Sequence, residues 1–156
     1  MFAVTDARIQ SVLSVRARVS IKRELQELCR AHAAACAFLW TASERGEVRS
    51  RIESAGDPTS LPVSRDLGGG CTFVCAQRTL RCADGEAREV VLLYDRLCTA
   101  APVLVLGLVD SRAAFTDVLT EDMEGAGDRL ESILVDALEP LPPASPGART
   151  GAPSRR

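Results

Sequence analysis

The sequence of 156 residues has few of the side chains on which most enzymes depend. It contains a single histidine, His32, so a Ser-His-Asp or Cys-His arrangement has only one candidate base. The hydroxyl and carboxylate residues around His32 do not have the spacing of a triad. A surface position, or a hydrogen-bonded one on a helix, is the better interpretation of this imidazole. We therefore expect no catalytic residues and no enzyme activity.

Long hydrophobic runs and an excess of positive charge are also missing. No apolar stretch approaches the roughly 20 residues that cross a bilayer, and the first residues do not form the continuous apolar segment of a secretory signal. The formal net charge of -2 and the isoelectric point of about 5.5 argue against a nucleic-acid binder. These absences predict a cytoplasmic protein without membrane or nucleic-acid partners.

The cysteines do not follow a common metal-binding pattern. The six are Cys29, Cys36, Cys71, Cys75, Cys82 and Cys98. The C-x2-C spacing of zinc ribbons is missing and no histidine lies nearby, so we predict no metal and no cofactor. Without a secretory signal, these thiols are expected to be reduced and to pack mostly as small apolar residues. One alternative stays open, because a helix beginning after Gly70 would lower the pKa of Cys71 and make it redox-active.

Apolar residues at spacings of three and four predict a long helix near each end of the domain. The first is expected over residues 5–36, with a bend or a break near 16–20, where Ser20 could cap a second helix. The second runs from about Thr120 to Leu138. 

Two glycines lie in this second helix. Gly127 is beside the apolar stripe, where a missing side chain would allow close approach to a sheet. Gly125 is not, and it favours a break into two helices.

Between the two helices, short β-branched and alternating runs predict a sheet. Residues 37–42 and 48–54 flank a polar connection with a glycine, which is typical of a hairpin, and its second strand should lie near an edge. Residues 88–97 and 101–110 are predicted to be buried neighbouring strands, and 79–82 a shorter one. The expected fold class is α/β of the α+β kind, a central antiparallel sheet of about five or six strands flanked by N- and C-terminal helices.

Two segments are predicted to lack regular structure. Residues 56–70 contain Pro58, Pro62 and three consecutive glycines, so we expect a loop, followed by a stretch at 71–77 that is ambiguous between helix and strand. Residues 140–156 hold five of the eight prolines and have no apolar period. The predicted organisation is therefore one domain over 1–139, with an extended N-terminal helix, and a disordered, basic Pro/Gly-rich tail over 140–156.

The order of these elements resembles that of a GAF domain, a sensory module with a central antiparallel sheet. LQELC at 25–29 leading into AFLW at 37–40 looks like its first helix and strand. GGCTFVCA at 69–76 looks like its short helix after a glycine. VLVLG at 103–107 followed by AFT at 114–116 looks like its last strand and the approach to the closing helix. The resemblance covers about residues 21–138.

The resemblance implies a small-ligand pocket, for which Trp40, Phe73 and Tyr94 are the candidate lining residues together with Cys71 and Cys75. Plain core packing of the three aromatic residues is the alternative. The chain departs from the family in three ways: the stretch is short, the Cys-His pair that anchors bilins is absent, and so is the Asn-Lys-Phe-Asp-Glu signature of cyclic-nucleotide GAF domains. The identity of any ligand is therefore not predicted.

The functional prediction is a non-catalytic regulatory sensor or protein-protein interaction module, which dimerises or docks on a protein partner through its helices. The same order of elements is similar to roadblock and profilin-like modules, so a structural scaffold subunit without a ligand pocket is the alternative. A cysteine-dependent redox enzyme is a further alternative.

Overall fold

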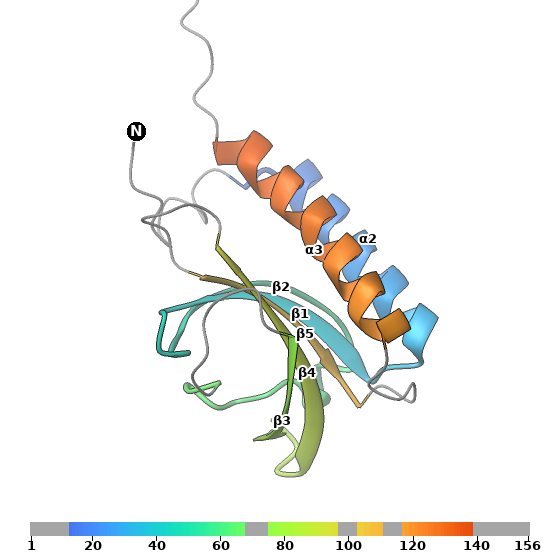
Figure 1. Ribbon diagram of the computed structural model, residues 1–156, viewed down its shortest axis with the longest axis vertical. Helices are drawn as coiled ribbons and strands as arrows, with labels where there is room; N and C mark the ends of the chain where they lie inside the picture. The colour runs from blue at the N-terminus through green and yellow to red at the C-terminus, as the bar shows by residue number, and fades with distance from the viewer. Residues whose placement is uncertain (1–12, 68–74, 97–102, 111–116, 139–156) are drawn as a thin grey trace, which may run out of the picture.

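The computed structural model describes residues 13–67, 75–96, 103–110 and 117–138, which form one antiparallel sheet with two long helices on one of its faces (Figure 1). In chain order the elements are α2 (Val15–His32), β1 (Cys36–Ala42), β2 (Val48–Gly56), the 3-10 turn η1 (Pro58–Ser60), β3 (Cys75–Arg81), β4 (Ala87–Arg96), β5 (Val103–Val109) and α3 (Asp117–Leu138). This α+β architecture confirms the predicted fold class. The predicted tail, 140–156, lies outside the described residues.

The five strands are ordered β2-β1-β5-β4-β3, and every neighbouring pair is antiparallel. The hairpin of β1 and β2 is confirmed, with β2 at an edge. The strands β4 and β5 are neighbours, also as predicted, and β5 lies at the centre because it pairs with β1 on its other side. The ambiguous stretch at 71–77 is strand from Cys75 onward, since β3 begins there.

From Val15 onward the first helix is one continuous element, so the predicted break near 16–20 is wrong; the predicted helical residues 5–12 lie outside the described part of the chain. Ser14 is its N-cap and accepts a hydrogen bond from the backbone N–H of Ala17 at 3.1 Å, which leaves Ser20 as an interior residue. The helix ends at His32, earlier than predicted, because Ala33 adopts the left-handed conformation (φ 49°) and its N–H bonds back to Arg30 and Cys29.

The second long helix, α3, is also continuous, so the predicted break at Gly125 is wrong. It begins before Thr120, the expected start, with Asp117 in its first turn. The prediction for Gly127 is confirmed: this residue is buried, and a Cβ there would lie 3.0 Å from Cδ2 of Leu93 on β4. Tertiary packing of the apolar stripe offsets the low helix propensity of both glycines.

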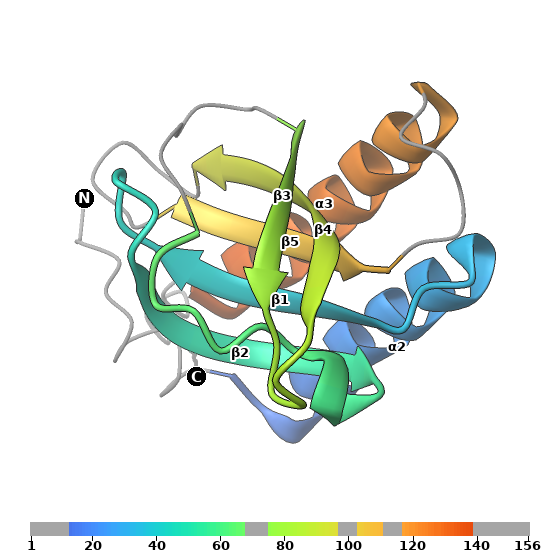
Figure 2. The ribbon, with the colours of Figure 1, turned by 90° about the horizontal axis from the view of Figure 1, so that it is seen from below.

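The sheet has a buried cluster on each face. The helix-side cluster joins α2 and α3 to one face of the sheet through aliphatic residues, including Leu25, Leu39, Leu106 and Leu130. The second-face cluster lies on the side away from the helices and contains Phe38, Trp40, Leu92, Tyr94 and Leu67 among others. Figure 2 looks at that side, where residues 57–67, the described part of the connection after β2, lie in front of the strands. The sheet is therefore a buried middle layer, which explains why β1 and β5 are buried along their whole length.

Candidate functional site

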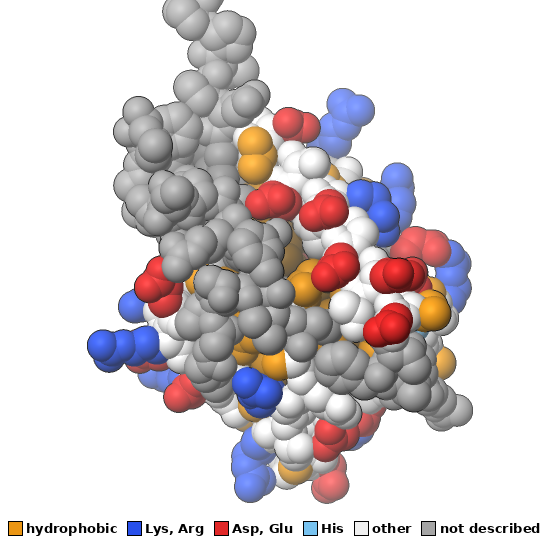
Figure 3. All heavy atoms as spheres, in the orientation of Figure 1, with side chains coloured by type: hydrophobic (Ala, Val, Ile, Leu, Met, Phe, Trp, Pro, Cys, Tyr) orange, Lys and Arg blue, Asp and Glu red, His pale blue; other side chains and the backbone are white. Residues whose placement is uncertain are grey.

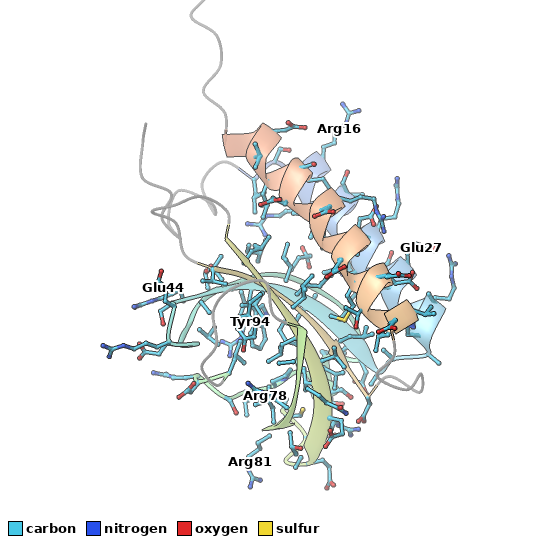
Figure 4. All side chains as sticks on the ribbon, in the orientation of Figure 1. Arg16, Glu27, Glu44, Arg78, Arg81 and Tyr94 are labelled. Carbon is cyan, nitrogen blue, oxygen red and sulfur yellow. The ribbon has the colours of Figure 1, made fainter. Side chains whose placement is uncertain are left out.

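Two of the predicted pocket residues, Trp40 and Tyr94, lie close together on the second face of the sheet. Both pair with Val105, Trp40 from β1 and Tyr94 from β4, so the three side chains form one row across the strands. Figure 4 shows Tyr94 on the side of the sheet away from the helices. Phe73 and Cys71 lie outside the described residues, as does the side chain of Cys75. The role of these five residues as a ligand site stays a prediction.

Trp40 and Tyr94 are packed rather than open to solvent, since each is only 1% exposed. The ring of Trp40 lies 4.0 Å from that of Phe38, centroid to centroid, and the guanidinium of Arg51 lies 4.6 Å from the Trp40 ring. The hydroxyl of Tyr94 donates a hydrogen bond to the backbone carbonyl of Leu67 at 3.2 Å. These contacts fix the segment ending at Leu67 against the sheet.

A glycine makes room for this aromatic stack. Gly107 of β5 pairs with Phe38, and a Cβ built on it would lie 2.0 Å from Cζ of Phe38. No side chain fits at that distance, so the ring of Phe38 occupies the space above the β5 backbone. The sequence signal was present, because Gly107 interrupts an otherwise apolar strand.

The described cysteines do not have the properties of reactive thiols. Burial raises the pKa of the Cys29 thiol to about 11. Burial, with smaller contributions from Cys29 and other nearby charges, raises that of Cys36 to about 12. The pKa of Cys82 is also raised, chiefly by burial. All three are free cysteines, and a protonated, buried thiol is a poor nucleophile.

A polar cluster that the sequence did not predict holds one end of the sheet. The guanidinium of Arg88 on β4 forms ion pairs with Asp84, in the β3–β4 turn, and with Asp110, which follows β5. The hydrogen bond from Arg88 lowers the pKa of Asp84. Asp110 has a left-handed backbone (φ 52°), so this ion pair holds an unusual turn at the exit of β5.

The other candidate surface is the outer face of the helix layer, meaning the surface of α2 and α3 turned away from the sheet. A groove of about 410 Å³ runs between the two helices. It is lined by Glu24, Glu27, Leu28, Ala31, Glu121, Asp122, Gly125, Ala126 and Arg129. Small and apolar residues therefore lie among acidic ones, which is a combination that suits a protein partner.

Two polar contacts tie the helices together across this groove. Nε of Arg129 donates to a carboxylate oxygen of Glu24 at 2.8 Å, and Nε2 of His32 lies 2.9 Å from a carboxylate oxygen of Asp122. His32 is 7% exposed, so the lone imidazole occupies a hydrogen-bonded position on a helix, in agreement with one of the two predicted positions. The pairs also show that α2 and α3 run antiparallel.

The two helices carry opposite charge. The charged residues of α2 are Arg16, Arg18, Lys22, Arg23 and Arg30 against Glu24 and Glu27. Those of α3 are Asp117, Glu121, Asp122, Glu124, Asp128, Glu131 and Asp136 against Arg129. Figure 3 shows acidic side chains gathered over α3, with Lys and Arg along the α2 flank. This separation could have been read from the sequence, but a net charge of -2 for the whole chain conceals it.

Exposed apolar side chains also concentrate on the helix layer. Among the described residues, five large hydrophobic side chains are exposed, and four of them belong to α2 or α3: Val15 (80%), Val19 (50%), Val118 (65%) and Val135 (39%). The fifth is Val63. Single exposed valines are ordinary, but their concentration on two adjacent helices marks this layer as the more interaction-prone surface.

No known sequence family matches this chain, and no curated protein is similar to it by sequence. Solved structures do match. The type II free methionine-R-sulfoxide reductase of Thermoplasma acidophilum superposes with a TM-score of 0.53 at 14% identity, over 81% of this chain and 96% of the other. The second GAF domain of DevS from Mycobacterium smegmatis superposes with a TM-score of 0.51 at 17% identity, over 78% and 94%.

These matches concern the fold, because the identities are low. One neighbour is a reductase and the other is a GAF domain of a different protein, so the likeness does not decide between enzyme and non-enzyme. None of the described helices is long and apolar enough to span a membrane. With its five-stranded antiparallel sheet and its flanking N- and C-terminal helices, the chain has a GAF-like fold.

Proposed function

We propose that this chain is a cytoplasmic, non-catalytic regulatory module that binds protein surfaces through the outer face of its helix layer. The observation that carries the proposal is the concentration of exposed valines on α2 and α3, the two helices that also line a groove of about 410 Å³. The second face of the sheet is a weaker candidate, because Trp40 and Tyr94 are buried there and the segment ending at Leu67 covers them.

The non-catalytic part of the proposal is supported by the chemistry of the described side chains. Cys29, Cys36 and Cys82 all have raised pKa values, so they hold little thiolate at neutral pH. His32 is bound to Asp122 on the helix layer, away from the second face of the sheet. Across the described ranges, no three His, Cys, Asp or Glu side chains converge as metal ligands would.

Site-specific photo-cross-linking tests the proposal. The photoreactive amino acid benzoylphenylalanine is placed at Gln26 on α2 or at Ser132 on α3, both exposed, in protein expressed in its source cells. The matched controls carry it at Arg49 on β2 or at Glu86 in the β3–β4 turn, also exposed. We expect discrete adducts from Gln26 and Ser132, several-fold more abundant than those from the controls. Equal adducts from all four positions, or adducts from the controls alone, would overturn the proposal.

A further inference from the structure

We propose that the occupant of the helix layer is a second copy of this chain, seated with each α2 on the α3 of the other copy. The two-fold axis then runs parallel to the helices, and the four helices form a bundle. This inference rests on the proposed function, because it names the partner of the same surface. It also predicts how the two copies are arranged, from the charges on α2 and α3 and from which residues of the two helices lie at the same height.

The register of the helix pair is fixed by its two polar ties. Glu24 lies level with Arg129, and His32 lies level with Asp122. Because the helices are antiparallel and rise equally per residue, counting from these ties places Arg16 level with Asp136 and Arg30 level with Glu124. Arg23 falls within two residues of the level of Asp128. Three basic residues of α2 therefore each lie within two residues of the level of an acidic residue of α3.

These charges lie on the exposed side of each helix. Arg16, Arg23 and Arg30 are seven residues apart, so they share one helix face, and all three are exposed. Glu121 and Asp128 have the same spacing on α3 and are also exposed. Figure 4 shows Arg16 and Glu27 projecting from the helix layer away from the sheet. The outer face thus presents a basic stripe beside an acidic stripe.

Charge complementarity selects one of the two symmetric ways to stack this layer on itself. With the axis across the helices, α2 would meet α2 and α3 would meet α3, which opposes arginines to arginines and acids to acids. With the axis along the helices, α2 meets α3 twice, and both contacts join opposite charges. Glu27, which forms an ion pair with Arg30, does not reverse the balance, because that pair is exposed and solvent-screened.

The exposed valines agree with the second arrangement. Val15 and Val19 lie near the start of α2, and Val135 lies near the end of α3, at the same end of the helix pair. A two-fold rotation about an axis parallel to the helices does not change the height of a residue along that axis. Val15 and Val19 of one copy therefore lie at the same height as Val135 of the other copy. Two such apolar contacts thus form, both at the end of the four-helix bundle where α2 begins and α3 ends.

The size of the surface predicts a moderate affinity. An 18-residue helix is about 27 Å long, and two helices with their side chains are about 20 Å wide. The contact therefore buries about 1,100 Å² over both copies, near the lower end for specific interfaces. We expect a dimer with a dissociation constant on the order of micromolar, weakened several-fold between 50 and 500 mM salt.

Charge reversal with cross-rescue tests the arrangement, using full-length chain and analytical ultracentrifugation. One variant carries R16E and R23E on α2, and the other carries D128R and D136R, at the matching levels of α3. Each variant alone places like charges at both contacts, so we expect its dimer to weaken at least tenfold. In an equimolar mixture one contact is wild type and the other is reversed on both sides, so the heterodimer should recover to within about threefold of wild type.

The control variant carries R45E and R49E on the β1–β2 hairpin, with the same change of charge, and should dimerise like wild type. Figure 4 shows Glu44, in this hairpin turn, far from the helix layer. Thermal unfolding of each variant checks the fold, and recovery in the mixture shows directly that both variants are folded.

Three results would overturn the inference: a wild-type chain that is monomeric at 100 µM, single variants that dimerise like wild type, or a mixture that does not recover. The failure of this inference can be distinguished from the failure of the proposed function. Adducts from Gln26 and Ser132 to a different protein, together with a monomeric wild type, would retain the interaction surface and reject the second copy as its occupant.

Discussion

The two faces of the sheet are closed in different ways. On the helix side, the buried residues are aliphatic side chains and one methionine, and a regular apolar stripe on each helix covers them. On the second face, an irregular segment covers Phe38, Trp40 and Tyr94, the three aromatic residues that the structure describes. A helix buries a sheet face with apolar side chains that recur at regular intervals. An irregular segment has no such repeat, so it needs large flat side chains and individual polar contacts, such as the hydrogen bond from Tyr94 to Leu67. The predictions below test this difference, from the largest expected effect to the smallest.

Trp40 and Leu39 are consecutive residues of β1 that face opposite sides of the sheet, and both are fully buried. Trp40→Ala should lower the free energy of unfolding by about 3–5 kcal/mol and Leu39→Ala by about 2–5 kcal/mol. Urea unfolding measures both. Hydrogen exchange should then distinguish the two faces. Trp40→Ala should lower the protection of backbone amides in residues 57–67, and Leu39→Ala should lower it in α2. Loss of α2 protection in both variants would mean that the faces are not independent.

Gly107→Ala should destabilise the second face by about 2–3 kcal/mol, because its Cβ would overlap the ring of Phe38. A double-mutant cycle with Phe38→Ala identifies the cause. Once the ring is removed, Gly107→Ala should cost less than 1 kcal/mol, which gives a clear coupling energy in urea unfolding. Additive costs would show that the backbone of β5, and not the ring of Phe38, requires the glycine.

High pH should destabilise the fold through Cys36. Its pKa is about 12 when folded, against 9.0 as the ordinary value, so between these limits the unfolded chain loses the proton first. The contribution of the protonated Cys36 thiol to the free energy of unfolding is complete below pH 9. This contribution is lost as the pH rises, by about 1 kcal/mol at pH 10. The difference in unfolding free energy between wild type and Cys36→Ala should shrink by that amount from pH 8 to pH 10. A constant difference would mean that the thiol ionises equally in both states.

Gly125→Ala and Gly127→Ala form a matched pair within α3. At Gly125 the new Cβ meets only Nη1 of Arg129, at 3.4 Å, so the gain in helix propensity should stabilise the protein by about 0.5–1 kcal/mol. At Gly127 it meets Leu93 at 3.0 Å on the buried side, which should cancel that gain. Thermal unfolding measures both. A larger gain at Gly127 than at Gly125 would contradict the close packing of α3 on β4.

Much of the fold could be predicted from the sequence, because apolar periodicity reports directly which side of an element is buried. The strand pairs and both helices followed from it. The wrong break near Ser20 came from an interrupted apolar period at 16–20, and the one at Gly125 came from low helix propensity, which tertiary packing overrode. Strand alternation also separates Leu39 from Trp40, but nothing in one sequence says which of the two faces the helices cover.

The candidate site was harder to predict. Trp40 and Tyr94 do lie close together, yet their closure by Leu67 depends on the path of a segment with no periodic pattern. The pairing of His32 with Asp122 joins residues 90 positions apart, so no local signal could show it. The opposite charges of α2 and α3 were readable in advance, but their meaning depends on the antiparallel contact that brings the two helices side by side.

That antiparallel contact also determines how the domain responds to force. The start of α2 and the end of α3 lie at the same end of the helix layer (Figure 1). Tension applied between these two points would peel the helices apart one turn at a time, breaking the tie at Arg129 before the one at Asp122. The hydrogen bond from the guanidinium of Arg18 to the backbone carbonyl of Ile52 lies still nearer the loaded end, so the edge strand β2 shares the first mechanical step.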